Sequence, residues 1–242
     1  MKKSILGGFL LLLAAVSQAF PAPASSAAAF DKRFEIAKAR NEGFFASISI
    51  RPQAVFGDFR SDLTLWHFDK AFYVPRFSHG FGADYGIGLG HKNAYGSWEI
   101  RYSLALPKAA VGGTTEAVQF HELEISGRSF FFPGRAVQPY GLLGIDLPLV
   151  VVPDGASYLG EKLNAAYAGA GLHAGAGVTW DFAPDSFLDI GIVYRYVIFY
   201  YAYGEGKGRD INHLRTTQDG DQFGRLLRAS SLALTASLGF LF

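Results

Sequence analysis

Most of the chain alternates between apolar residues and small or polar residues with a period of two, which is typical of β-strands whose two faces meet different surroundings. Residues 97–104 are the clearest case, with one face formed by Trp98, Ile100, Tyr102 and Leu104 and the other by Ser97, Glu99, Arg101 and Ser103. No helical spacing produces this division. The same pattern recurs in five more segments: residues 44–51, 81–90, 168–180, 188–198 and 231–242.

Two further segments alternate less clearly. In residues 117–130, either Val118 and Phe120 or Leu123 and Ile125 fit the outer set, and a bulge would shift the phase between them. In residues 138–147 both faces are largely apolar, and only the flanking turn residues indicate a strand. With these two, the pattern predicts eight strands.

The connections between these segments alternate in length. Residues 91–95, 133–136 and 181–185 are short, whereas residues 56–78, 107–116, 148–164 and 203–228 are long. Short turns at one end and long loops at the other are typical of transmembrane barrels. We therefore predict an all-β fold: an eight-stranded antiparallel up-and-down transmembrane β-barrel with short periplasmic turns, long extracellular loops and both termini on the periplasmic side.

A soluble barrel with its apolar face inside would alternate in the same way. Three features favour apolar residues outside. The other face is mostly Gly, Ser and Thr, which suit a narrow lumen. The chain ends on Phe242, whose alternate predecessors back to Leu232 are all apolar. Aromatic residues gather near segment ends, as expected of interfacial belts: Tyr95, Trp98, Phe130, Phe131, Phe132, Trp180, residues 194–203, Phe240 and Phe242.

The composition of the chain excludes some kinds of site and partner. Only 18% of the 242 residues are charged, which is below the usual quarter for soluble domains. The chain has no cysteine, so disulfides and thiolate metal sites are excluded. A formal net charge of +1 gives no indication of a nucleic-acid partner.

Residues 1–19 read as a secretory signal peptide. Lys2 and Lys3 precede an apolar run over residues 5–16, which is shorter than the roughly 20 residues of a membrane-spanning helix. Cleavage after Ala19 or after Ala24 fits the small residues that precede each site. We expect a periplasmic leader over residues 20–42 and the barrel over residues 43–242. Residues 31–41 fit either a short amphipathic helix or a disordered segment.

Several short motifs resemble the small OmpA-like outer-membrane barrels. Pro139-Tyr140 with Gly141 and Gly144 is similar to the fifth strand of that superfamily, residues 175–180 (GAGVTW) to the sixth and Tyr194-Arg195-Tyr196 to the seventh. Asp146 departs from the pattern, because a second glycine is usual there. No peptidoglycan-binding domain follows, so the resemblance implies no tether of that kind. It implies a location in the bacterial outer membrane, contact with outer-membrane lipid and lipopolysaccharide, and assembly by the barrel-assembly machinery, which would read Leu238, Phe240 and Phe242 as its signal.

Eight charged residues fall on the inward faces and form a predicted lumen charge network: Asp84, Glu99, Arg101, Glu122, Glu124, Arg128, Asp189 and Arg195. Charges in a narrow interior must pair or remain hydrated. Eight strands leave a lumen that is mostly filled by side chains. We expect a structural ion-pair network, with a gated or narrow pore as the alternative.

The sequence predicts no catalytic residue, cofactor or metal. Glu122 and Glu124 share a face, as paired carboxylates do in some hydrolases, but adjacent lumen charges explain them equally well. His121-Glu122 lacks the second histidine of a zinc-peptidase motif. His173 fits a metal ligand, a base or a hydrogen-bonded filler.

We therefore expect a non-enzymatic, monomeric barrel with a structural or surface-interaction role. The alternatives are a narrow channel for small or apolar solutes and a membrane-embedded lipid-modifying enzyme.

Overall fold

The computed structural model describes residues 42–60, 63–67, 70–77, 82–206, 209–215 and 227–242. These residues belong to one compact unit. The predictions for the signal peptide, for the leader up to residue 41 and for residues 31–41 lie outside the described residues. The described part of the chain contains no helix that is long and apolar enough to cross a membrane.

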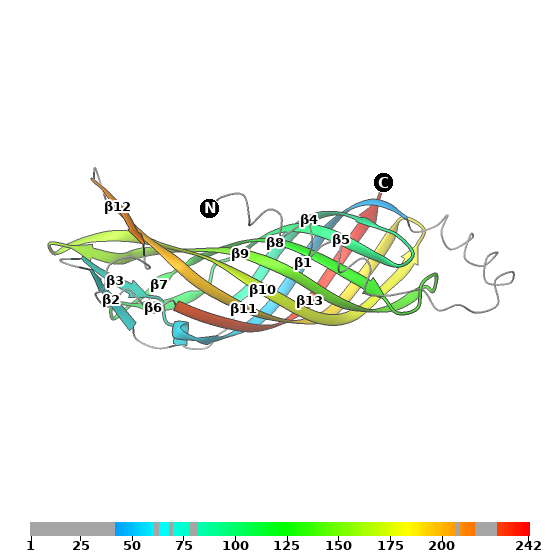
Figure 1. Cartoon of the computed structure of the whole chain (residues 1–242), viewed down its shortest axis with the longest axis horizontal. Helices are drawn as coiled ribbons and strands as arrows, with labels where there is room; N and C mark the ends of the chain where they lie inside the picture. Colours follow the sequence, from blue (N-terminus) through cyan, green and yellow to red (C-terminus); the bar gives the residue numbers. More distant parts are fainter. Residues whose placement is uncertain (1–41, 61–62, 68–69, 78–81, 207–208, 216–226) are drawn as a thin grey trace, which may run out of the picture. The chain divides into compact units, whose positions relative to one another are not determined.

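Eight strands close into a ring by antiparallel pairing, which confirms the predicted up-and-down barrel (Figure 1). Around the ring each strand pairs with the next along the chain, and β1 pairs with β13 to close it. The strands are β1 (Gly43–Gly57), β4 (Gly82–Lys92), β5 (Gly96–Ala105), β8 (Gln119–Phe130), β9 (Val137–Tyr158), β10 (Glu161–Ala183), β11 (Ser186–Gly206) and β13 (Leu227–Leu241).

The structure decides the phase of the two ambiguous strands. From Gln119 opposite Val151 to Phe130 opposite Tyr140, β8 and β9 pair without a register shift, so the possible bulge in β8 does not form. Leu123 and Ile125 face outward, while Glu122 and Glu124 are buried inside. Val118 and Phe120 share the inward phase of these carboxylates and pack in an apolar cluster beyond them.

Three of the connections are as short as predicted, but the four long ones are not plain loops. Residues 148–164 are almost entirely strand, because β9 and β10 continue to a tight turn at residues 159–160. Pro153, Asp154 and Gly155 look like a turn in sequence. In the structure Asp154 takes a φ of 52° beside a register shift between β9 and β10, and the hairpin continues past it.

The other long connections contain structure as well. The predicted loop 107–116 forms a hairpin of β6 (Lys108–Val111) and β7 (Thr114–Ala117), which ends one residue beyond it. The turn of this hairpin places Gly112 and Gly113 at φ values of 53° and 91° that favour glycine. Between β1 and β4 lie η1 (Asp58–Arg60), β2 (Leu63–His67) and β3 (Lys70–Val74), and β12 (Arg209–Arg215) pairs with β11. Strand β3 also pairs with the outer end of β9. We call these elements, with the outer ends of β9, β10 and β11, the loop-side extension (Figure 1).

The loop-side extension and the adjoining end of the lumen share one apolar cluster. Its buried members come from both: Phe59, Leu65, Phe72, Val74, Phe77, Ala109, Val111, Val118, Val150, Val152, Ala156, Leu163, Ala165, Tyr167, Val197, Phe199, Ala202 and Leu227. Phe59 is central, with its ring 4.9 Å from that of Phe199 and 6.2 Å from that of Phe77. The connections predicted as long loops therefore form a packed extension of the barrel.

Replacing Phe59 with alanine is expected to loosen this extension by about 3–5 kcal/mol, the usual loss for a buried phenyl ring. The ring of eight strands does not depend on this contact, so the gel-mobility difference between unheated and boiled samples should persist. Limited proteolysis checks the prediction, because cleavage in the extension should become faster. Phe56→Ala, at an exposed neighbouring phenylalanine, is the control. Equal cleavage rates for the two variants would contradict it.

The outer face of the ring is apolar. Many of its large side chains are about half exposed, with fractions of 44–64% for Ile48, Ile87, Leu89, Ile100, Leu143, Leu172, Ile190, Ile192 and Leu234. In water, a monomer rarely exposes contiguous apolar patches of more than a few hundred Å². A closed ring that is apolar outside and charged inside has the polarity of a barrel that spans a lipid bilayer.

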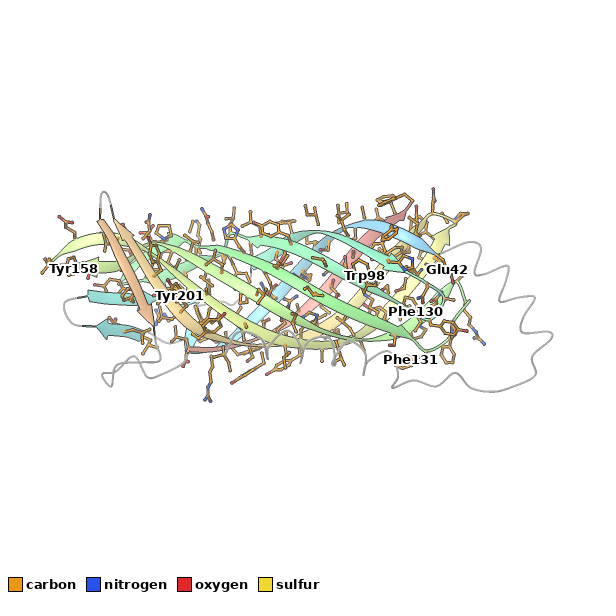
Figure 2. All side chains as sticks on the ribbon, turned by 45° about the horizontal axis from the view of Figure 1, so that its top comes forward. Glu42, Trp98, Phe130, Phe131, Tyr158 and Tyr201 are labelled. Carbon is orange, nitrogen blue, oxygen red and sulfur yellow. The ribbon has the colours of Figure 1, made fainter. Side chains whose placement is uncertain are left out.

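Exposed aromatic side chains lie towards both ends of this apolar face. Figure 2 places Trp98 and Phe131 near the end with the short turns. Towards the other end, Phe56, Tyr85 and Tyr200 are exposed on β1, β4 and β11. Phe44, Tyr95, Phe132, Trp180 and Phe240 are also exposed on the short-turn side. The inclusion of Phe130 in the outer set is wrong, because this residue is only 7% exposed and its ring packs against that of Tyr140 inside the barrel.

Candidate functional site

The barrel lumen holds the candidate site. All eight residues of the predicted lumen charge network are buried there, each less than 10% exposed. Five further residues with basic or carboxylate side chains lie in the same interior: Arg51, Lys92, Asp146, His173 and Asp181. Together they form two groups along the lumen, the turn-side cluster and the loop-side cluster.

The turn-side cluster contains Lys92, Glu99, Arg101, Arg128, Asp181 and Asp189. Glu99 is its centre, because one carboxylate oxygen accepts hydrogen bonds from Arg101 Nη2 at 2.7 Å and from Arg128 Nη2 at 2.8 Å. Ser47 donates to the other oxygen of Glu99. Three cationic and three carboxylate side chains are present, so the cluster is formally neutral.

Three side chains of the same region contact the carboxylate of Asp189. Tyr140 Oη donates to its Oδ1 at 2.7 Å, Thr179 Oγ1 to its Oδ2 at 3.1 Å, and Arg128 Nε lies 3.4 Å from that oxygen. Two hydrogen-bond donors, on β9 and β10, and one ion-pair partner, on β8, therefore connect the carboxylate on β11 to three other strands. Such hydrogen bonds offset the cost of burying the charge.

A phenylalanine layer closes the turn end of the lumen. The rings of Phe45 and Phe187 meet edge to face at 5.2 Å, and Lys92 Nζ lies 4.9 Å from the centre of Phe187 and 5.6 Å from that of Phe130. Lys92 also pairs with Asp181. Gly239 makes room for this layer, since a Cβ at that position would clash with the Phe187 ring.

The loop-side cluster contains Arg51, Asp84, Glu122, Glu124, Asp146, His173 and Arg195. Arg51 Nε donates to Asp84 Oδ1 at 2.8 Å, and its Nη2 lies 3.3 Å from Glu122 Oε2 and in contact with Glu124. This guanidinium also donates to Ser103 Oγ at 3.0 Å. One side chain of β1 thereby connects to carboxylates on β4 and β8.

Arg195 and His173 complete the loop-side cluster from the opposite wall. Arg195 Nη2 donates to Glu124 Oε1 at 3.1 Å, and its Nη1 lies 3.6 Å from Glu122 Oε2. His173 Nδ1 lies 2.7 Å from Asp146 Oδ1. Glu122 and Glu124, which the sequence places on one face, therefore share both arginines.

The alternation contained a signal for some of the five added residues. Arg51 has the inward phase of Ser47 and Ser49, and Lys92 has the phase of Asp84 further along the same strand. The sequence pattern puts Asp181 in a turn, but β10 extends through it. Asp146 departs from a glycine pattern in sequence, and the structure shows it fully buried beside His173.

The predicted assembly-signal residues lie on the outer face at the turn end. Phe240 is 48% and Phe242 80% exposed, and the backbone N–H of Phe242 donates to the carbonyl of Phe44 at 2.9 Å. Strand β13, which carries Leu238 and Phe240, is paired on both edges, with β1 and β11. A factor that recognises this strand by backbone pairing would have to act before the ring closes.

His121 lies on the outer face and takes no part in the lumen. Its Nδ1 is 2.7 Å from Tyr102 Oη, and its Nε2 is 3.3 Å from Gln119 Oε1. The adjacent residue Glu122 points inward, so the His121-Glu122 dipeptide brings no paired catalytic groups together.

Comparison with known proteins gives structural likenesses only. No family model and no curated protein matches the sequence. Among solved structures, Neisserial surface protein A is 14% identical with a TM-score of 0.49, over 83% of this chain and 97% of that one. OprG from Pseudomonas aeruginosa is 11% identical with a TM-score of 0.48, over 85% and 98%. A major outer membrane protein from Thermus thermophilus is 14% identical with a TM-score of 0.47, over 81% and 99%.

At such identities a likeness says nothing about function. The architecture rests on the chain's own geometry: eight antiparallel strands in a closed ring, an apolar outer face with aromatic residues towards its ends, and a lumen filled with paired charges. These are the properties of a small outer-membrane β-barrel.

Proposed function

We propose that this chain is a closed, non-enzymatic outer-membrane barrel that acts as a rigid support for its loop-side extension at the cell surface. The observation that carries the proposal is the filling of the lumen by successive groups of packed side chains. The phenylalanine layer, the two charged clusters and the apolar cluster follow one another along the same interior. A barrel that is filled in this way is suited to presenting a surface.

Among the residues that the structure describes, the apolar cluster is closely packed. A cavity of about 40 Å³ lies within it, lined almost entirely by apolar groups such as Val55, Phe120 and Phe199, with Gln53 at the side of the charged clusters. This volume holds only a few water molecules, and apolar cavities tend to stay dry. Hydrated ions would have to displace packed side chains to pass.

Conductance of the refolded protein in planar bilayers tests this proposal. We expect no discrete current steps for the unaltered chain. Arg101→Ala and Glu99→Ala should also remain closed, because each leaves the phenylalanine layer and the apolar cluster in place. Protein boiled before addition controls for detergent leaks. Reproducible steps from the folded chain alone would support the channel alternative and overturn the proposal.

A separate measurement tests the proposal that the chain is not an enzyme. Expression of the chain in the outer membrane should leave the lipid A mass spectrum unchanged relative to an empty vector. A new deacylated or otherwise modified species would favour the lipid-modifying alternative.

A further inference from the structure

The two charged clusters differ in their balance. The turn-side cluster is neutral, whereas the loop-side cluster sets two arginines, Arg51 and Arg195, against four carboxylates: Asp84, Glu122, Glu124 and Asp146. Even with His173 protonated, one negative charge in the loop-side cluster has no counterpart among its members. An excess of buried carboxylates of this kind is offset by a proton on one of them or by an added cation.

Three side chains of this cluster converge in a way that suits a metal ion. Glu124, Asp146 and His173 each offer one ligand atom, and these atoms lie within 4.8 Å of one another. They come from the adjacent strands β8, β9 and β10, with Glu124 directly opposite Asp146 and His173 opposite Gly144. All three are buried, with Asp146 fully so.

Unpartnered atoms at the same place are an independent observation. Asp146 Oδ2, His173 Nε2 and Glu122 Oε1 are buried and have no hydrogen-bond partner in the described structure. Buried polar atoms are normally satisfied, and exceptions call for an explanation such as a bound ion. Gly144 makes room for the imidazole, because a Cβ at that position would clash with His173 Nε2.

The donor set selects a class of metal. One imidazole nitrogen with carboxylate oxygens suits zinc and similar first-row transition metals, whereas calcium and magnesium prefer oxygen ligands alone. We propose that the lumen binds a divalent transition-metal ion, represented by Zn²⁺, through Glu124, Asp146 and His173. The ion adds positive charge beside carboxylates that outnumber the two arginines.

This site would be loaded as the barrel folds, because packed layers close the lumen on both sides. The experiment therefore refolds the full chain from urea into detergent with ZnCl₂ or with EDTA, removes free metal, and measures bound zinc by mass spectrometry. We expect about one zinc ion per chain after refolding with ZnCl₂. Zinc added after refolding in EDTA should bind far less.

His173→Gln is the informative variant, since glutamine retains a hydrogen-bond donor for Asp146 but removes the imidazole. It should lose the bound zinc, while His121→Gln on the outer face should retain it. Folding of each variant is checked by the gel shift on boiling. Absence of zinc from the wild-type chain, or equal zinc in wild type and His173→Gln, would overturn the proposal.

Refolding the wild type with Co²⁺ gives a readout that does not depend on variants. An enclosed site with few ligands should give strong visible absorption, and an ion held only at the surface should give the weak spectrum of hydrated cobalt. The weak spectrum would also overturn the proposal. A metal-free closed barrel would leave the proposed function intact, since conductance is measured separately.

Discussion

Arg51→Ala is expected to destabilise the barrel by about 3–5 kcal/mol, because removing one partner of a buried ion pair leaves charge uncompensated. Arg51 is fully buried and contacts Asp84, Glu122 and Glu124 at once. Its loss leaves Arg195 as the single arginine of a cluster that already has an excess of carboxylates. Urea unfolding of protein refolded into lipid vesicles, followed by tryptophan fluorescence, measures the effect.

Two further variants define what this result means. Arg60→Ala removes an exposed arginine in η1 and should change stability by no more than about 0.5 kcal/mol. Arg51→Lys keeps the charge but loses the planar fork that reaches several carboxylates, so it should fall between the two. If Arg51→Ala unfolds at the same urea concentration as Arg60→Ala, the network does not stabilise the barrel.

Leu234→Arg is expected to cost about 2–4 kcal/mol, the penalty for a cation on the lipid face of a barrel near the middle of the bilayer. Leu159→Arg is the matched control. The two leucines are similarly exposed, at 58% and 68%. Leu234 lies in the middle of β13, whereas Leu159 lies in the turn that joins the far ends of β9 and β10.

The two positions differ mainly in the medium around the side chain, which is lipid at Leu234 and water at Leu159. The comparison therefore tests the membrane placement directly. Leu159→Arg should change stability by less than about 0.5 kcal/mol, because the arginine remains in water. The same unfolding assay in vesicles gives both values. Equal costs would mean that the apolar face of β13 does not meet lipid.

The sequence predicted the inward direction of a charged residue only where the apolar and polar residues of its strand alternate regularly. Glu99 and Arg101 lie in the clearest alternation of the chain, so their inward direction follows directly from the pattern. Asp146 lies in a strand with two apolar faces, where the period gives no phase. Its direction follows only from its register with β8, which places it opposite Glu124.

The loop-side extension could not be predicted for a related reason. Residues 148–164 contain Pro148, Pro153, Asp154 and Gly155, which individually favour turns. In the structure these residues lie within a hairpin, because a bulge near Asp154 lets both strands continue past them. Packing of the hairpin on the shared apolar cluster offsets the free-energy cost of the irregular backbone.

By itself, the sequence determined the number of strands in the ring, their order and the face that meets lipid, because a period of two with alternating connection lengths leaves few other arrangements. Tertiary structure alone decided which charges meet and whether they balance. Most ion pairs of the lumen join residues on different strands, and the tilt and register of the closed ring set the partner of each. The excess of carboxylates around His173 exists only once β1, β4, β8, β9, β10 and β11 face one another across the lumen.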